Sequence, residues 1–95
     1  MIRYQIAIPP FVAAQIVHLP PDIKRTTKHA LRVLSNDPHA GEPLRWDLEG
    51  LWKYRIRSFR IVYQIVTERR LLRVMAVDHR DTVYDLVRSI YRKSA

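Results

Sequence analysis

The stretch from Trp52 to Tyr63, WKYRIRSFRIVY, decides the fold of this chain, because basic and large apolar side chains alternate along it. Successive side chains of a β-strand point to opposite faces of the sheet. Three basic side chains are therefore expected on one face of a first strand: Lys53, Arg55 and Arg57. Three apolar ones are expected on the other: Trp52, Tyr54 and Ile56. The apolar face can join a core, and the cationic face attracts polyanions, of which nucleic acid is the commonest.

Two further strands are expected after this one, because runs of apolar residues resume twice. The three segments cover residues 52–57, 60–66 and 71–77, and they are separated by Ser58-Phe59 and by residues 67–70. Consecutive strands with such short connections pair most simply as an antiparallel meander.

The residues before the meander predict one strand and two helices. Residues 2–8 alternate, and Pro9-Pro10 end the strand. Its buried face would be formed by Ile2, Tyr4, Ile6 and Ile8. A short helix is expected over residues 11–18 and an amphipathic one over residues 23–35. The apolar face of the second helix would be formed by Ile23, Thr27, Ala30, Leu31 and Leu34. Residues 36–43, NDPHAGEP, are rich in turn formers and predict a loop.

Residues 82–92 predict a C-terminal helix, and Thr82 with Asp85 fits a capping box at its start. Its apolar stripe would be formed by Val83, Leu86, Val87, Ile90 and Tyr91. The predicted fold class is α+β: an N-terminal strand, a helical hairpin, a three-stranded antiparallel meander and a C-terminal helix, with the helices over one face of the sheet. The length predicts a single domain over residues 1–95.

Charge and composition restrict the partners. Seventeen Lys and Arg against nine Asp and Glu give a net charge of +8, which favours nucleic acid, a membrane surface or an acidic protein. Without a long apolar run or a signal-like amino terminus, the chain is expected to be cytoplasmic with no membrane partner. The absence of cysteine excludes disulfides and thiolate metal sites, and the four histidines lie far apart. No metal or cofactor is expected.

Three segments, in this order and at these separations, resemble the RelE/ParE superfamily of bacterial toxins. They are LEGLWKYRIR at residues 48–57, FRIVY at residues 59–63 and DHRDTVY at residues 78–84. The resemblance spans almost the whole chain. It implies a RelE-like microbial RNase fold and a toxin held inactive by a cognate acidic antitoxin, in some cases within a larger toxin–antitoxin assembly. In the RelE-like branch, it implies an endoribonuclease that cuts mRNA in the decoding site of the 70S ribosome.

The resemblance also implies a site made of basic residues on the middle strands and an arginine and a tyrosine near the last helix. The matching positions are Lys53, Arg55, Arg60, Arg80 and Tyr84. Cleavage by the 2′-hydroxyl requires a base, positive charge around the phosphate and an acid for the departing 5′-oxygen. Arg60 is expected to clamp the phosphate, because a guanidinium can hold two oxygens. Arg80 would neutralise charge on the leaving side, and Tyr84 would stack on a base or take the nucleophile's proton.

One departure from the RelE pattern changes the expected chemistry. The second of two lysines is replaced by Arg55, and arginine stays protonated in proteins, so it cannot act as a base. The GEPL loop followed by LEGLW looks like the YoeB branch, in which a glutamate is the base and a histidine the acid. Glu42 and His79 occupy those positions. Two versions of the site stay open, one led by Glu42, Arg60 and His79, the other by Lys53, Arg80 and Tyr84.

Most of these residues also have a purely structural explanation. The basic strand, proposed to bind RNA, could instead be a solvated face that discourages edge-to-edge pairing. Glu42 could be an ordinary solvent-facing carboxylate. His79 could cap the junction between strand and helix, and its neighbour Arg80 could pair with Asp78 or Asp81. Trp46 could contact antitoxin or RNA, or simply pack within its loop.

Three functions compete on these grounds. The leading hypothesis is a toxin of a type II toxin–antitoxin system that cleaves mRNA by metal-independent 2′-hydroxyl attack. The alternative is a ParE-like toxin that inhibits DNA gyrase without nuclease activity. A third is a degenerate member that binds antitoxin or RNA without catalysis. The basic strand pair together with Glu42 favours the first, because a pure gyrase binder would not need these residues.

Overall fold

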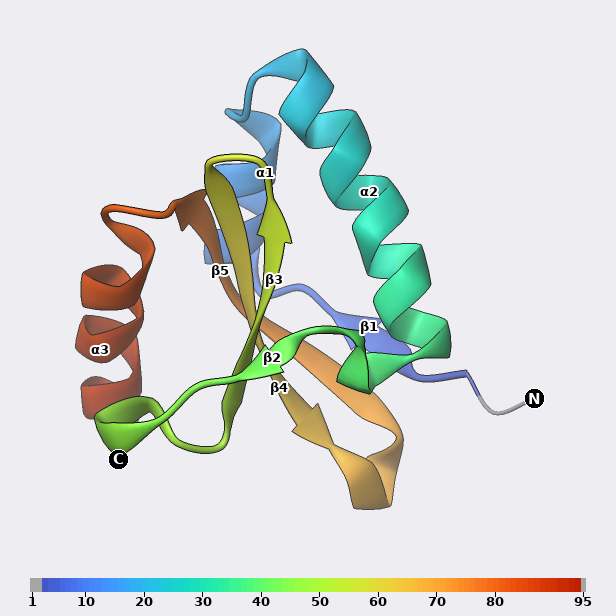
Figure 1. Cartoon of the computed structure of the whole chain (residues 1–95), viewed down its shortest axis with the longest axis vertical. Coiled ribbons are helices and arrows are strands. Elements are labelled where there is room, and N and C mark those ends of the chain that lie inside the picture. Colours follow the sequence, from blue (N-terminus) through green and yellow to red (C-terminus); the bar gives the residue numbers. More distant parts are fainter. Residues whose placement is uncertain (1–2, 95) are drawn as a thin grey trace.

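A central five-stranded sheet separates two layers of helices in the computed structural model (Figure 1). The structure describes residues 3–94, and it describes side chains for residues 3–91. The predicted α+β class, the order of elements and the meander are confirmed. The helices and strands are β1 (Gln5–Ala7), α1 (Pro10–Val17), α2 (Pro21–Asn36), β2 (Glu42–Pro43), β3 (Leu51–Ile56), β4 (Phe59–Val66), β5 (Leu71–His79) and α3 (Val83–Ser94).

The strands are ordered β1-β5-β4-β3-β2 across the sheet. The β3, β4 and β5 strands form the antiparallel meander. The β1 strand pairs in parallel with β5, and α1 and α2 follow β1 along the chain. The edge strand β2 was not predicted. It contains only Glu42 and Pro43, within the segment expected to be a loop, and a proline is tolerated there because β2 lies at the edge.

The helices do not all cover one face, so that part of the prediction is wrong. Figure 1 shows α2 and α3 on opposite sides of the sheet. The core under α1 and α2 contains Val12, Ile23, Leu34, Ile61, Tyr63 and Val77. The core under α3 contains Leu48, Leu51, Val62, Ala76, Val83 and Val87. We call these two sides of the sheet the α2 face and the α3 face. Both are covered because the central strand β4 is apolar on both sides.

Helices α1 and α2 begin one to two residues earlier than predicted, and α2 packs as its sequence predicts. Both α1 and α2 begin with a proline, Pro10 and Pro21, at a position where the missing N–H has no intrahelical partner to lose. All five predicted apolar positions of α2 are buried. Within the described residues, no helix is both long enough and apolar enough to cross a membrane.

Two local predictions differ from the structure. Around β1, Tyr4 and Ile6 pack against the α2-face core, whereas Ile8 is 40% exposed, and Ile2 lies outside the described residues. Helix α3 starts directly after Thr82, as expected, but without the capping box. The Thr82 hydroxyl lies 3.0 Å from Asp78 Oδ2, to which it donates a hydrogen bond. This contact ties the end of β5 to the start of α3.

Candidate functional site

Three basic side chains project from the α3 face of the meander. Lys53 and Arg55 alternate along β3 with residues that pack into the α2-face core. Arg60 lies on β4 between Phe59 and Ile61, which also belong to the α2-face core. Because neighbouring strand side chains point to opposite faces, all three cations share the α3 face.

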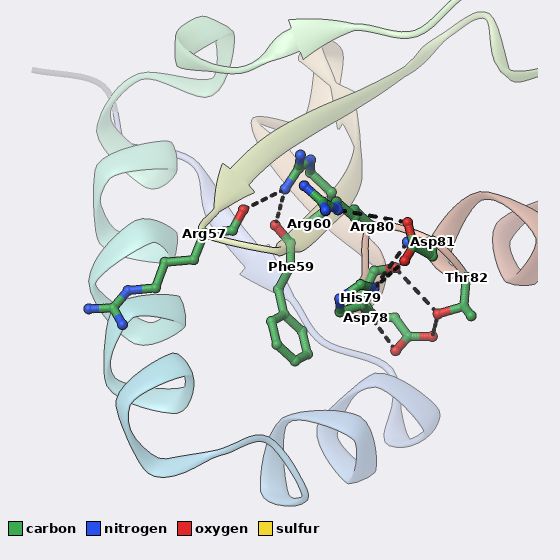
Figure 2. A network of polar contacts seen from close by, with 8 residues as sticks. All are labelled: Arg57, Phe59, Arg60, Asp78, His79, Arg80, Asp81 and Thr82. Carbon is green, nitrogen blue, oxygen red and sulfur yellow. Dashed lines mark hydrogen bonds and ion pairs between the residues drawn. The ribbon is translucent and has the colours of Figure 1, made fainter.

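Arg55 and Arg60 lie directly opposite each other in the register of β3 and β4. Side chains in such a pair start about 5 Å apart at their Cβ atoms. Arg60 Nη1 donates to Arg57 O at 2.9 Å and to Phe59 O at 2.8 Å, which holds its guanidinium against the hairpin turn (Figure 2). Among the ion pairs of residues 3–91, none involves Arg55 or Arg60. Two opposed, uncompensated cations form a site suited to an anion.

A groove of about 470 Å³ opens between the β2–β3 edge and α3. Glu42 lies opposite Lys53 in the β2–β3 register, and Tyr84 reaches the same groove from the first turn of α3. The remaining lining residues are Pro43, Leu44, Arg45, Trp46, Leu48 and Arg88. A carboxylate, an ammonium and a phenol from three elements thus meet in one place. The two predicted versions of the site each supply at least one of these groups.

Two close contacts fix the backbone that carries Glu42. Gly41 packs so tightly that a Cβ atom there would overlap Lys53 O and the Tyr63 hydroxyl. The wholly buried Tyr63 donates to Pro38 O at 2.7 Å. Burial raises the pKa of Tyr63 to about 12, so its hydroxyl stays a donor at neutral pH. The segment before β2 is therefore held from both sides of the glycine.

Arg57 does not share the face of Lys53 and Arg55, and that prediction is wrong. The β3 strand ends at Ile56, and Arg57 adopts a left-handed backbone conformation with φ 53° in the turn. Its Nη1 lies 3.2 Å from Asp22 Oδ2 on α2. The turn interrupts the strand alternation and sends this side chain toward α2 instead.

His79 lies on the α2 face, away from Glu42 and Arg60. Its ring packs edge-on against Phe59 with 5.6 Å between centroids, and His79 Nδ1 accepts a hydrogen bond from the Asp81 backbone N–H at 3.2 Å. Figure 2 shows the Phe59 ring and the Arg60 guanidinium extending in opposite directions from β4. The predicted trio of Glu42, Arg60 and His79 is therefore not gathered in one groove.

Arg80 lies at the junction of β5 and α3. Its backbone N–H donates to Ser58 O at 2.8 Å, and its Nε lies 3.7 Å from Asp81 Oδ1. The structural alternative of pairing with Asp81 is thus realised, whereas the Asp78 carboxylate accepts from the His79 backbone N–H and from Thr82. Arg80 is exposed and does not line the groove.

Two groove cations were missed by sequence reasoning. Arg45 directly precedes Trp46, and Arg88 lies one helical turn after Tyr84. Arg88 Nε donates to Asp47 Oδ2 at 2.8 Å, which joins α3 to the segment before β3. The spacing of Tyr84 and Arg88 was a usable signal, because residues four apart share a helix face.

Trp46 does not pack within its loop, because it is 89% exposed at the rim of the groove. No group of three or more histidine, aspartate and glutamate side chains is placed to hold a metal ion in the part of the chain that the structure describes.

The fold and the sequence have counterparts among known proteins. Residues 7–84 match the family model described as ParE toxin of type II toxin-antitoxin system, parDE. The chain belongs to the RelE/ParE superfamily of type II toxins. The toxin is 35% identical over 68 residues to Toxin RelG of Mycobacterium tuberculosis, covering 70% of this chain and 78% of the relative.

Two further relatives of the toxin come from the same organism. Toxin RelE of M. tuberculosis is 32% identical over 83 residues, covering 85% of this chain and 86% of the relative. The crystal structure of the M. tuberculosis RelBE2 toxin-antitoxin complex superimposes with a TM-score of 0.76 and 29% identity. That match covers 84% of this chain and 94% of the other.

Proposed function

We propose that this toxin is a ribosome-dependent endoribonuclease that cuts mRNA in the decoding site, within the cytoplasm. The observation that carries the proposal is the composition of the α3 face. The opposed cations Arg55 and Arg60 lie on the same side of the sheet as a groove that contains Glu42, Lys53 and Tyr84. These are the groups that RNA cleavage through its own 2′-hydroxyl requires.

The proposed reaction assigns each proton and bond. The Glu42 carboxylate takes the proton of the 2′-hydroxyl, whose oxygen attacks the adjacent phosphorus. The bond from phosphorus to the 5′-oxygen breaks, which leaves a 2′,3′-cyclic phosphate on one fragment. The departing 5′-oxygen takes a proton from the Lys53 ammonium or the Tyr84 phenol and becomes a hydroxyl. Cationic side chains, with Arg60 as the phosphate clamp, stabilise the extra negative charge of the transition state.

The positions of the other candidates give them lesser roles. His79 is disfavoured as the acid, because its ring lies on the α2 face against Phe59. Arg80 and Arg57 are exposed, so in this proposal they contact the RNA backbone or the ribosome rather than the reacting atoms. Phosphate contacts of this kind add affinity without reading sequence.

A cognate acidic antitoxin is the proposed inhibitor. The solved M. tuberculosis relative is a toxin-antitoxin complex, and the net charge of this chain is +8. A partner of opposite charge would bind fast and would compete with RNA for the α3 face. The same contacts could build a larger toxin–antitoxin assembly.

Inhibition of DNA gyrase is the second candidate, because the matching family model is that of the ParE toxin. This function needs a protein-binding surface but no base, acid or phosphate clamp. A gyrase supercoiling assay with the purified toxin separates the two functions.

The deciding experiment is primer extension on a defined mRNA in a purified translation system, with parallel reactions lacking toxin or lacking ribosomes. We expect cuts at codon-phased positions on translated message only, with 5′-hydroxyl and 2′,3′-cyclic phosphate ends. Intact message together with blocked supercoiling would establish the gyrase function instead. Intact message and normal supercoiling would identify a toxin-like protein without catalysis.

A further inference from the structure

Trp46 is the most exposed of the large hydrophobic side chains that the structure describes. Its residue is 89% exposed, whereas Phe11 is 49% and Val17 63% exposed. Burial of a tryptophan is among the larger contributions to a core, and here almost none of that area is used. The indole of Trp46 therefore contributes little to holding the folded chain together.

The backbone conformation of Trp46 is strained, which lowers the stability of the folded chain. Its φ is 61°, a left-handed conformation that bulky side chains seldom adopt and that glycine adopts freely. Such strain persists only where the surroundings enforce it, and it concentrates at functional sites. A residue that strains the backbone and packs against little is better explained by a ligand than by the fold.

The segment under the indole is held firmly. Leu48 is 3% exposed, Asp47 accepts a 2.8 Å hydrogen bond from Arg88, and the Glu49 backbone N–H donates to Trp46 O at 3.1 Å. The indole thus projects from a fixed base at the rim of the groove, which lowers the ordering cost of binding.

The chemistry around Trp46 favours RNA over a protein partner. Most of the other side chains that line the groove are charged or polar, with the cations Arg45, Lys53 and Arg88 among them. The apolar remainder is Pro43, Leu44 and Leu48. The other exposed apolar side chains, Ile8, Phe11 and Val17, lie in or next to α1 on the other side of the sheet, so they do not extend Trp46 into an apolar patch. An aromatic ring among cations is how proteins hold single-stranded nucleic acid, by stacking a base while the cations hold the backbone.

We infer that Trp46 is a stacking platform for one base of the single-stranded message, next to the phosphate that is cut. This inference rests on the proposed nuclease function and adds a residue that positions the substrate. Purines stack more strongly than pyrimidines because their rings overlap more of the indole. The platform therefore favours a purine at one position beside the cut.

The test compares binding of oligoadenylate and oligouridylate of equal length by fluorescence anisotropy. Trp46→Ala should weaken oligoadenylate binding about tenfold or more and should remove the preference over oligouridylate. Trp46→Phe should keep most of the affinity. Phe11→Ala, which removes another exposed aromatic ring far from the groove, is the matched control and should bind as the parent does.

Two further measurements separate a platform from a structural role. Trp46→Gly should melt no lower than the parent, because glycine relieves the left-handed strain, yet it should bind as weakly as Trp46→Ala. In Trp52→Phe, which leaves Trp46 as the sole tryptophan, oligoadenylate should quench the emission.

The outcomes of the platform and of the nuclease are distinct. If the parent cuts translated message and Trp46→Ala cuts it at the same rate and positions, the platform is refuted and the nuclease stands. The platform is also refuted if the parent and Trp46→Ala bind oligoadenylate with the same affinity as each other, and each binds oligouridylate equally well. A parent that cuts nothing refutes the nuclease, and the platform with it.

Discussion

Arg55 on β3 and Arg60 on β4 lie directly opposite each other in the antiparallel ladder. Their side chains therefore leave the same face of the sheet about 5 Å apart. Like charges in this position destabilise a sheet, by up to about 1 kcal/mol. The chain nevertheless carries them, and within residues 3–91 neither is part of an ion pair. A bound phosphate would relieve this repulsion. The free energy that the repulsion costs the free protein would then favour binding of the phosphate.

Arg60→Ala is expected to reduce mRNA cleavage about a hundredfold or more, because it removes the clamp on the transition-state charge. Its free energy of unfolding should change little, because relief of the repulsion with Arg55 offsets the loss of the two hydrogen bonds that Arg60 donates to the hairpin backbone. Primer extension and urea unfolding measure the two effects. Arg25→Ala is the matched control, because it removes an exposed guanidinium on α2 that does not line the groove. Full cleavage by a folded Arg60→Ala protein would eliminate the clamp.

Glu42→Gln is expected to slow the cleavage step by about 10² to 10⁴, the usual contribution of a general base, while RNA binding is retained. The amide keeps the shape of the side chain but cannot take the proton. Single-turnover cleavage on programmed ribosomes measures the step directly. Glu49→Gln alters another exposed carboxylate close by in sequence, outside the groove lining, and should behave as the parent.

His79→Ala tests whether this histidine acts as the acid, as the version of the site led by Glu42, Arg60 and His79 requires. Because the His79 ring packs against Phe59 on the α2 face, its loss should reduce cleavage far less than the loss of Glu42. A larger loss in His79→Ala than in Glu42→Gln, in proteins of equal stability, would restore the histidine as the acid and would imply that β5 rearranges on the ribosome.

The sequence predicted an element correctly where its pattern of apolar residues repeats several times. The apolar face of α2 and the alternation of β3 were predicted correctly because each repeats several times. The position of α3 was not predicted, because an apolar helical stripe does not say which side of a sheet it covers. The run Ile61-Val62-Tyr63, buried on both sides, was the available signal that two layers would be needed.

The sequence predicted which residues belong to the candidate site better than it predicted which of them lie together. Glu42 came from the family resemblance, since a two-residue strand has no period to read. Its placement opposite Lys53 depends on that short strand. The face of the sheet on which His79 lies depends on a register shift between β4 and β5, which could not be predicted from the sequence.

Gly41→Ala is expected to destabilise the protein by about 1 to 3 kcal/mol, the usual cost of forcing atoms into filled space. The added Cβ would overlap Lys53 O and the Tyr63 hydroxyl, although the backbone conformation of Gly41 itself suits any residue. Because the strain falls on the β2–β3 pairing, cleavage should fall along with stability. Urea unfolding and primer extension measure both.

Gly50→Ala is the contrasting variant, because an added Cβ would make only an ordinary contact, 4.0 Å from the Tyr91 hydroxyl, but the φ of Gly50 is 97°. It should cost about 1 kcal/mol through backbone strain alone, with cleavage largely kept. If Gly41→Ala and Gly50→Ala lost cleavage equally at matched stability, the close packing of Gly41 would not be what positions Glu42.

Tyr63→Phe tests the buried hydroxyl that holds the segment before β2. At neutral pH it should cost about 1 to 3 kcal/mol, because the Pro38 carbonyl loses its partner. Burial raises the pKa of Tyr63 from 10.0 to about 12, so the folded state holds this proton more tightly than the unfolded state. Its contribution to stability is therefore complete below about pH 10 and is lost as the pH rises to about 12.

The difference in unfolding free energy between parent and Tyr63→Phe should consequently narrow between about pH 8 and about pH 11. The variant contains every other titrating group, so their effects cancel in the difference. Urea unfolding at the two pH values is the measurement. Parallel losses of stability in the two proteins would mean that Tyr63 ionises without cost, and that its hydroxyl does not anchor the strand that carries Glu42.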